Sequence, residues 1–216
     1  MFIMRNGDEI YKDFSKVLIT RDRIRERVAE MGRELTRDYA GKLPVVISVL
    51  RGSVIFFSDL IREMDVHMIT DFMAVSSYGN SDKSSGQVVI TKDTKIPLEG
   101  MDVLVVEDII DTGLTLKALM NILAGRGVSS LRLAVLLDKP ARREVHDLKP
   151  DYTGFEVPDE FLVGYGLDYC GYYRNAPDIA VLRPEVAKEI EAEITKHAEE
   201  TAEQIVRTAV RQAIEG

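Results

Sequence analysis

The chain has 216 residues and a formal net charge of −8, from 28 Lys and Arg against 36 Asp and Glu. This acidic balance argues against a nucleic-acid-binding protein, because such proteins neutralise phosphates with clustered basic side chains. Apolar residues make up 45 % of the chain and charged residues 30 %. This balance is typical of a globular domain with its own core and excludes a disordered chain.

The cysteine and histidine content and the apolar runs restrict the expected cellular compartment and the metal sites of the protein. The only cysteine is Cys170, so no intrachain disulfide can form and we expect a cytoplasmic protein. Charges interrupt every apolar run near the N-terminus, and no window reaches the ~18 consecutive apolar residues of a membrane span, so we expect neither a signal peptide nor a membrane partner. The three histidines, His67, His146 and His197, lack the spacing of zinc ligands.

The first predicted elements are a helix, a strand and a second helix. Residues 20–38 place apolar side chains at helical spacing on one face, with Thr20 as the predicted N-cap. Residues 45–50 form a short β-branched run that is typical of a buried strand. A small-residue loop at 51–53 then leads into a helical pattern at 54–64. A strand, a tight loop and a helix in that order predict half of a parallel α/β unit.

The same order recurs further along the chain. Residues 102–124 are predicted to form a buried strand, a loop at 107–113, and a helix that stops at Gly125 or Gly127. Residues 130–138 form a third apolar strand. Strands separated by helices predict an α/β fold, a parallel sheet with helices on its faces. Ligands of such sheets bind beyond the carboxyl ends of the strands.

Two segments depart from this repeat. Residues 76–87 are rich in Ser and Gly between strand-like segments, which suits either a loose hairpin loop or an active-site lid. From Pro184 to the C-terminal residues there is no further proline, and apolar residues recur at helical spacing. We expect one helix of about 30 residues, or two helices broken near His197. The helix would either dock on the surface or contact another subunit or partner.

The most informative motif is VLVVEDIIDTGLT at 103–115. Its buried strand leads into two adjacent carboxylates, Glu107 and Asp108, followed by Asp111 and a small-residue loop that opens a helix. The free N–H groups and the positive dipole of a helix N-terminus suit a phosphate. Carboxylates would repel that phosphate, so they must address sugar hydroxyls, a metal ion or a proton in transfer. A phosphorylated ribose meets both demands.

This motif resembles the phosphoribosyl pyrophosphate (PRPP) motif of the type I phosphoribosyltransferases. Four surrounding segments resemble, in matching order, the hypoxanthine-guanine phosphoribosyltransferases: LRGS (50–53), DFMAVSSYG (71–79), LLDKPARR (136–143) and GFEVPDEFLVGYGLDYCGYYR (154–174). The resemblance covers roughly residues 15–183. It implies the type I fold, a parallel central sheet flanked by helices, with a small hood. We therefore expect a phosphoribosyltransferase domain at 1–183 and a C-terminal helical extension at 184–216.

The resemblance implies a purine-salvage enzyme. Such an enzyme transfers the phosphoribosyl group of PRPP to the 6-oxopurines hypoxanthine or guanine, with Mg²⁺ as cofactor, and gives IMP or GMP and pyrophosphate. The alternatives are an enzyme specific for xanthine or for hypoxanthine alone, and a non-catalytic regulator of the same fold that senses PRPP. The family also implies a homo-oligomer, either a dimer or a tetramer.

The roles of the acidic motif follow from the same resemblance. Asp111 corresponds to the general base that accepts the proton of purine N7, or to a group that stabilises positive charge on the ring. Glu107 and Asp108 correspond to the residues that hold the ribose hydroxyls. The contacts of the 5′-phosphate correspond to Thr112, Gly113, Leu114 and Thr115. Mg²⁺ is implied at Glu107, Asp108 and Asp168.

Other segments of the resemblance supply the remaining contacts. Pyrophosphate contacts correspond to Arg51, Gly52 and Arg174, with a cis peptide bond between Leu50 and Arg51. Purine contacts correspond to Lys139, Phe161, Leu162 and Asp168. Without the resemblance, Lys139 would be interpreted as a surface lysine and Phe161 as a core residue.

A lid is the last implied feature. Ser77 and Tyr78 correspond to a pair in a flexible loop that closes over the reaction centre. A lid has a chemical purpose here, because water could capture the oxocarbenium-like carbon that forms when pyrophosphate leaves.

Overall fold

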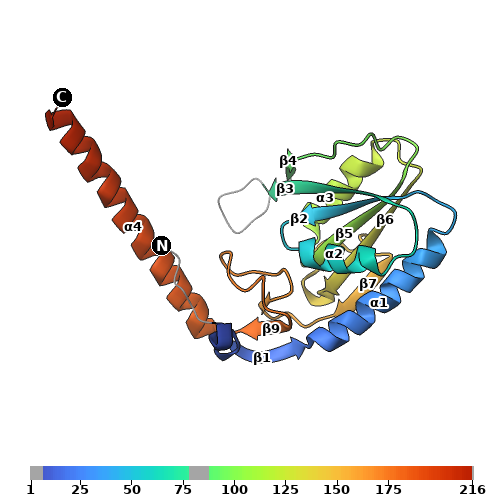
Figure 1. The fold of residues 1–216 in the computed structure, drawn as a ribbon, viewed down its shortest axis with the longest axis horizontal. Helices are drawn as coiled ribbons and strands as arrows, with labels where there is room; N and C mark the ends of the chain where they lie inside the picture. Colours follow the sequence, from blue (N-terminus) through green and yellow to red (C-terminus); the bar gives the residue numbers. More distant parts are fainter. Residues whose placement is uncertain (1–6, 78–87, 216) are drawn as a thin grey trace.

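The structure, a computed structural model, describes residues 7–77 and 88–215. A six-stranded sheet in the order β4-β3-β2-β5-β6-β7 forms its centre (Figure 1). The strands are β2 (Val45–Leu50), β3 (Ile69–Ser77), β4 (Val88–Lys92), β5 (Asp102–Ile110), β6 (Ser130–Asp138) and β7 (Tyr152–Glu156). Neighbouring strands are parallel except β3 and β4, which are antiparallel. The predicted α/β fold with a mostly parallel sheet is confirmed.

Helices cover both faces of this sheet. Helices α1 (Arg21–Asp38) and α2 (Val54–Arg62) pack on one face, and α3 (Leu114–Ala124) packs on the other (Figure 1). Strand β5 shows why: Leu104 and Val106 join the core under α1 and α2, whereas Val103 and Val105 join the core under α3. Successive side chains of a strand point to opposite faces, so a strand covered on both sides is apolar throughout.

The structure departs from the sequence prediction at the end of β5. We expected a loop at 107–113, but β5 continues to Ile110, which pairs with Asp138 of β6. Glu107 and Asp108 therefore belong to the strand, in which Glu107 pairs with Val135 and Ile109 with Leu137 of β6. The predicted helix boundaries agree better with the structure: Thr20 is the N-cap of α1, and Gly125 is the C-cap of α3.

A three-stranded antiparallel sheet, here called the hood, lies beside the central sheet (Figure 1). It contains β1 (Phe14–Ile19), β9 (Ile179–Leu182) and β8 (Leu162–Val163), in that order. The 3₁₀ helix η1 (Gly7–Asp13) precedes β1. Asp178, just before β9, accepts hydrogen bonds from the Tyr11 hydroxyl and from the backbone N–H of Arg21 at 2.6 Å. The hood is thereby joined to the start of α1.

Helix α4 (Pro184–Glu215) is continuous and projects away from the rest of the molecule, so there is no break near His197 (Figure 1). Val186 and Ile190 are buried in an apolar cluster with residues of the hood, whereas every residue at 191–201 is exposed. The helix is therefore docked through its first two turns.

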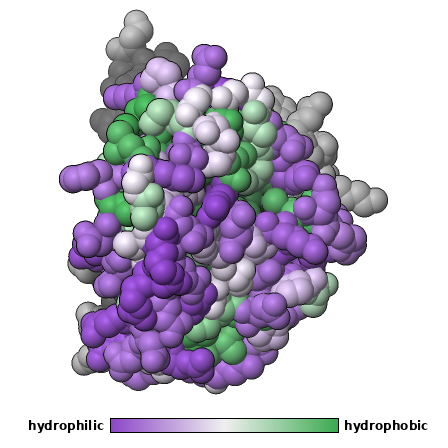
Figure 2. Space-filling model, turned by 90° about the vertical axis from the view of Figure 1, so that its right-hand side faces the viewer, coloured by the Kyte–Doolittle hydropathy of each residue, from purple (hydrophilic) through white to green (hydrophobic). Residues whose placement is uncertain are grey.

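The side of the molecule that faces away from α4 is mostly hydrophilic, and its hydrophobic residues lie in small groups (Figure 2). Within residues 7–77 and 88–215, no helix is both long enough and apolar enough to cross a membrane.

The docking of α4 predicts a difference between two isoleucines one turn apart. Ile190 is 2 % exposed, so Ile190→Ala should lower the free energy of unfolding by about 2–4 kcal/mol, because it removes buried methyl groups and leaves a cavity. Ile194 is 43 % exposed, and Ile194→Ala should change this free energy by less than about 0.5 kcal/mol. Chemical denaturation of both variants measures the difference, and equal losses would contradict docking through the first two turns.

Candidate active site

The candidate site lies at the carboxyl ends of β2, β5 and β6, which are neighbours in the sheet. Arg51 follows β2, Asp111 follows β5 and Lys139 follows β6. The backbone N–H of Lys139 donates to the carbonyl oxygen of Ile110 at 3.0 Å, which holds the ends of β5 and β6 together. The parallel sheet thus brings three segments that are distant in sequence to one edge, where ligands of such sheets bind.

The predicted purine contacts line one cavity of about 470 Å³, the purine cavity. Its lining includes the following residues: Asp108, Asp111, Lys139, Arg142, Asp159, Phe161, Leu162 and Asp168. Phe161 is 53 % exposed, and its ring packs edge-on against Tyr169 with centroids 5.2 Å apart. Lys139 is only 5 % exposed. Without the resemblance, Lys139 was expected at the surface and Phe161 in the core. Both expectations are wrong, since the lysine is buried and the aromatic ring is open to solvent.

The predicted pyrophosphate contacts border a second cavity, of about 630 Å³. Arg51 and Arg174 line it together with Asp168, which also lines the purine cavity. Arg174 donates to the carbonyl oxygen of Gly166 at 2.6 Å and pairs with Asp168 at 2.6 Å. The two cavities are therefore adjacent, with a carboxylate between a cationic site and a site lined by an aromatic ring.

Gly52 lets a carboxylate approach the loop 50–53. A Cβ atom at position 52 would lie 1.5 Å from Oδ2 of Asp108, so a side chain there would displace this carboxylate. On the other side of the loop, a Cβ at Gly166 would lie 2.0 Å from the carbonyl oxygen of Gly52. The Leu50–Arg51 peptide bond is cis, as the resemblance implied. The loop is thus enclosed between β5 and the segment that follows β8.

The N-terminus of α3 has the form of a phosphate site. Gly113 is the N-cap with φ 84°, a left-handed conformation that glycine adopts most readily. The carbonyl oxygen of Thr112 accepts hydrogen bonds from the N–H groups of Glu144 at 3.0 Å and Val145 at 3.3 Å, which fixes the loop. The N–H groups of the first helical turn have no partner within a helix and point toward an incoming anion.

Burial destabilises the ionised forms of the two carboxylates in β5. Desolvation raises the pKa of Glu107 well above its usual range, the charge of Asp108 raises it further, and Oε2 of Glu107 has no hydrogen-bond partner. Desolvation also raises the pKa of Asp108 to about 6 and outweighs the hydrogen bond from the Ile109 N–H and the charge of Arg174. Such buried carboxylates are typical of sites where a ligand supplies the missing partners.

Sequence reasoning assigned no role to two adjacent arginines at this edge. Arg142 ends the 3₁₀ helix η2 (Pro140–Arg142), and its Nε lies 3.2 Å from Oδ1 of Asp111. The Arg143 side chain is 9 % exposed, pairs with Asp138 and donates to the carbonyl oxygen of Leu148 at 2.6 Å. The rule for parallel sheets placed ligands beyond the carboxyl end of the strand at 130–138, but it is the turn of η2 that directs Arg142 to Asp111 and buries Arg143.

The lid pair stays a prediction. Ser77 is the last residue of β3, and Tyr78 lies outside the described residues.

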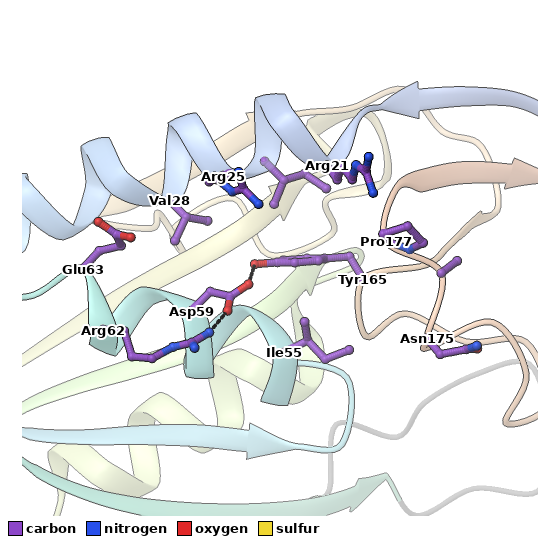
Figure 3. Close-up of a pocket in the computed structure, with 12 residues that line it drawn as sticks. Arg21, Arg25, Val28, Ile55, Asp59, Arg62, Glu63, Tyr165, Asn175 and Pro177 are labelled. Atoms are coloured by element: carbon purple, nitrogen blue, oxygen red, sulfur yellow. Dashed lines mark hydrogen bonds and ion pairs between the residues drawn. The ribbon is translucent and has the colours of Figure 1, made fainter.

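A further cavity of about 530 Å³ lies between α1, α2 and the segment that follows β8 (Figure 3). Tyr165 projects toward it, and its hydroxyl donates to Oδ2 of Asp59 at 2.6 Å (Figure 3). Asp59 also pairs with Arg62. Because Gly166 is next to Tyr165 and packs against Gly52, this contact ties α2 to the segment that supports the loop 50–53.

Comparison with known proteins assigns the chain and its fold to one family. The family described as phosphoribosyl transferase domain matches residues 20–170, and the chain therefore belongs to the phosphoribosyltransferase family. The chain is 51 % identical over 174 residues to the hypoxanthine-guanine phosphoribosyltransferase of Bacillus subtilis (strain 168). This match covers 81 % of this chain and 96 % of that protein. Within the family, it thus falls with the hypoxanthine-guanine phosphoribosyltransferases.

A solved structure and a longer relative extend this finding. The crystal structure of a hypoxanthine phosphoribosyltransferase from Staphylococcus aureus matches with a TM-score of 0.81 and 46 % identity, over 84 % of this chain and 98 % of that chain. The chain is also 50 % identical over 183 residues to the bifunctional protein TilS/HprT of Listeria monocytogenes serotype 4b (strain F2365). That match covers 85 % of this chain but only 28 % of the longer relative.

The contact at Gly52 predicts a specific defect. Gly52→Ala should weaken PRPP binding by about 100-fold, because the new Cβ displaces the Asp108 carboxylate and shifts the loop 50–53. Isothermal titration calorimetry with PRPP and Mg²⁺ measures the dissociation constant. Gly125→Ala is the matched control, since a Cβ there would meet its nearest atom at 3.4 Å. An unchanged dissociation constant in Gly52→Ala would show that PRPP binding does not depend on the enclosed loop 50–53.

The raised pKa of Asp108 predicts a pH-dependent gain in stability when the charge is removed. Because its pKa rises from an ordinary 3.8 to about 6, the stability that this group contributes is complete below about pH 4 and is lost as the pH rises through 6. Without ligand, Asp108→Asn should therefore be more stable than the wild type by up to about 3 kcal/mol at pH 7.5, with a smaller gain at pH 5.

Thermal unfolding at the two pH values, with and without PRPP and Mg²⁺, tests this expectation. The ligands should stabilise the wild type more than Asp108→Asn, because the ionised carboxylate then has its partners. A gain that does not grow with pH would contradict burial as the cause of the shift.

Proposed function

We propose that the chain transfers the phosphoribosyl group of PRPP to hypoxanthine or guanine in purine salvage, giving IMP or GMP and pyrophosphate. One observation carries the proposal: the purine cavity joins the Asp111 carboxylate, the buried Lys139 and the exposed ring of Phe161, and it shares Asp168 with the cavity of Arg51 and Arg174. A planar base and a polyanionic leaving group thus have adjacent places, with the reacting carbon between them.

The purine cavity supplies the acceptor half of the reaction. The Phe161 ring stacks on the purine, and Lys139 donates a hydrogen bond to its 6-oxygen, which favours hypoxanthine and guanine over adenine. As purine N9 attacks C1′ of the ribose, the C1′–O bond to pyrophosphate breaks and its electrons leave with pyrophosphate. The Asp111 carboxylate accepts the proton that N7 loses, so the purine product is neutral. Backbone groups of Leu162 meet the ring edge.

The donor half involves three separate segments. The N-terminus of α3, with its N–H groups at 112–115, binds the 5′-phosphate. Glu107 and Asp108 hold the ribose hydroxyls, and a ribose there gives their buried carboxylates hydrogen-bond donors. Arg51 and Arg174 face the pyrophosphate and stabilise the charge that it gains as it leaves.

The carboxylates fit a Mg²⁺ ion that arrives with the donor. Within the described ranges, no group of three or more His, Cys, Asp or Glu side chains is placed to hold a metal by itself. Mg²⁺ is usually bound through one or two carboxylates, substrate phosphates and water, so such a cage is not required. Glu107, Asp108 and Asp168 are the residues proposed to meet it. A Mg²⁺ ion held there would supply positive charge to offset that of the pyrophosphate leaving group.

For the setting, we propose a cytoplasmic homo-oligomer with a catalytic domain at 1–183 and a helical appendage at 184–216. The single free and exposed Cys170 is consistent with a reducing compartment. The exposure of residues 191–201 supports treating most of α4 as separate from the catalytic domain.

Removal of the proposed proton acceptor tests the mechanism. Asp111→Asn should lower kcat by about 100- to 1,000-fold, because an amide of the same shape cannot accept the N7 proton. Its dissociation constant for PRPP should change by less than about threefold, since Asp111 contacts the acceptor and not the donor. Steady-state kinetics with hypoxanthine and calorimetry with PRPP measure the two quantities, and an unchanged kcat would remove Asp111 from this role.

A panel of bases tests the reaction itself. Pyrophosphate release is followed with hypoxanthine, guanine, xanthine and adenine, each with and without Mg²⁺. We expect turnover with hypoxanthine and guanine that requires Mg²⁺, and none with adenine. Turnover with xanthine or hypoxanthine alone would narrow the specificity, whereas PRPP binding without any turnover would favour a regulator of the same fold.

A further inference from the structure

Arg142 connects two sides of the purine cavity. Its Nε lies 3.2 Å from Oδ1 of Asp111, and its Nη1 lies 3.7 Å from Oδ1 of Asp159. Asp111 follows β5, whereas Asp159 belongs to the segment 157–161 that ends in Phe161. All four residues line the purine cavity. One guanidinium therefore bridges the proposed proton acceptor and the segment that carries the stacking ring.

The contact with Asp111 has an unusual geometry. Oδ1 of Asp111 is shielded from solvent and has no hydrogen-bond partner, although Nε of Arg142 lies 3.2 Å from it. The side chains of Asp111 and Arg142 are 42 % and 48 % exposed, so a ligand can reach them. Ion pairs this exposed contribute little to stability. The bridge therefore contributes little to the stability of the fold, and its charge lies next to the Asp111 carboxylate, where a bound purine would meet both groups.

The backbone beneath this bridge is firmly held. Pro140 begins η2, and the N–H of Arg142 donates to the carbonyl oxygen of Lys139 at 3.1 Å. The next residue, Arg143, is tied to Asp138 and to the carbonyl oxygen of Leu148. The turn therefore presents the Arg142 side chain to the purine cavity from a fixed position.

We propose that Arg142 is a positioning residue for the transfer reaction. It holds the Asp111 carboxylate toward purine N7 and ties Asp159, and with it the Phe161 segment, to the same point. Its effect is confined to purine binding and proton transfer, because Arg142 lines the purine cavity and not the cavity of Arg51 and Arg174. This inference rests on the proposed function of Asp111.

The first test separates the two substrates. Arg142→Gln should lower kcat about tenfold, because a misplaced carboxylate accepts the proton less well. The KM for hypoxanthine should rise, while the KM for PRPP should stay within about twofold of the wild-type value. Arg142→Lys, which keeps the charge but can pair with only one carboxylate at a time, should recover part of kcat. A merely structural role would affect both KM values and would appear in thermal unfolding.

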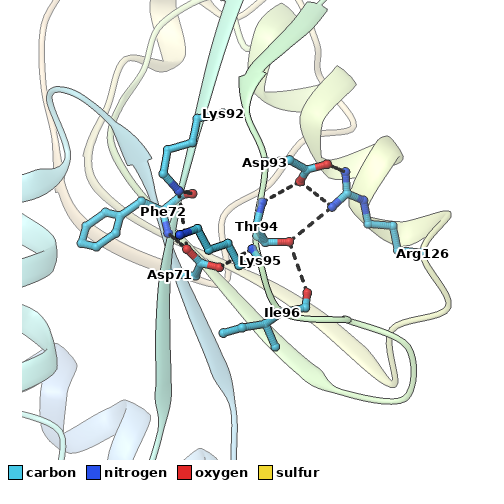
Figure 4. Close-up of polar contacts among 8 residues, drawn as sticks. All are labelled: Asp71, Phe72, Lys92, Asp93, Thr94, Lys95, Ile96 and Arg126. Atoms are coloured by element: carbon cyan, nitrogen blue, oxygen red, sulfur yellow. Dashed lines mark hydrogen bonds and ion pairs between the residues drawn. The ribbon is translucent and has the colours of Figure 1, made fainter.

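A double-variant cycle tests whether Arg142 acts through Asp111. In the Asp111→Asn background, Arg142→Gln should cause no further loss of kcat, because the group that it positions is already inactive. The matched control is Arg126→Gln. Arg126 forms an ion pair with Asp93 at 2.7 and 2.8 Å, and this pair lines neither cavity of the site (Figure 4). This variant should leave kcat and both KM values unchanged.

The outcomes distinguish this inference from the function on which it rests. If Asp111→Asn abolishes turnover but Arg142→Gln changes neither kcat nor the KM for hypoxanthine, the positioning role is overturned and the proposed function stands. Losses that add fully in the double variant would also overturn it, because Arg142 would then act independently of Asp111. If Asp111→Asn keeps full turnover, the proposed role of Asp111 fails, and the positioning role fails with it.

Discussion

Two adjacent carboxylates at the end of a doubly covered strand are the constraint on which the rest of the site depends. Strand β5 must be apolar to lie between α1, α2 and α3, yet near its carboxyl end it carries Glu107 and Asp108, and burial raises the pKa of both. The fold tolerates this electrostatic cost because neighbouring segments are shaped around the carboxylates: Gly52 leaves space for Asp108, and Arg174 brings a positive charge. The ionised carboxylates have all their partners only when a ligand supplies hydrogen-bond donors and cations. The free protein is therefore less stable, and the ligand is bound more tightly.

The hood brings the other half of the site to these carboxylates. Its strands come from opposite ends of the domain, since β1 pairs with β9 and β9 pairs with β8. Immediately before and after β8 lie Phe161 and the segment 164–168, which reach the purine cavity and the loop 50–53. The geometry of the purine cavity therefore depends on contacts between distant parts of the chain, such as those of Asp178 with Tyr11 and Arg21.

Local patterns predicted much of the fold but not the enclosure of individual side chains. Apolar periodicity located α1, β2, α3 and β6 because these elements bury one face or both. It could not show that β5 continues through two carboxylates, because ladder hydrogen bonds with β6 override the low strand propensity of acidic residues. Lys139 is buried and Phe161 exposed because of where β6 ends and β8 begins, which no local pattern records. The resemblance implied a purine contact for both but assigned nothing to Arg142, whose direction depends on a single 3₁₀ turn.

The net charge of −8 describes the surface and not the site. Residues 184–216 carry eight Glu against four Lys and Arg, so half of the acidic excess belongs to the helical extension. Most of that helix projects from the body, and salt screens exposed charges beyond about 10 Å, so its field at the sheet edge is small. At the site, the cations Arg51, Lys139, Arg142 and Arg174 lie near the carboxylates Asp108, Asp111 and Asp168. A site with opposite charges in adjacent cavities can bind a phosphate-rich donor at one end and accept a proton at the other, which a uniformly basic surface could not do.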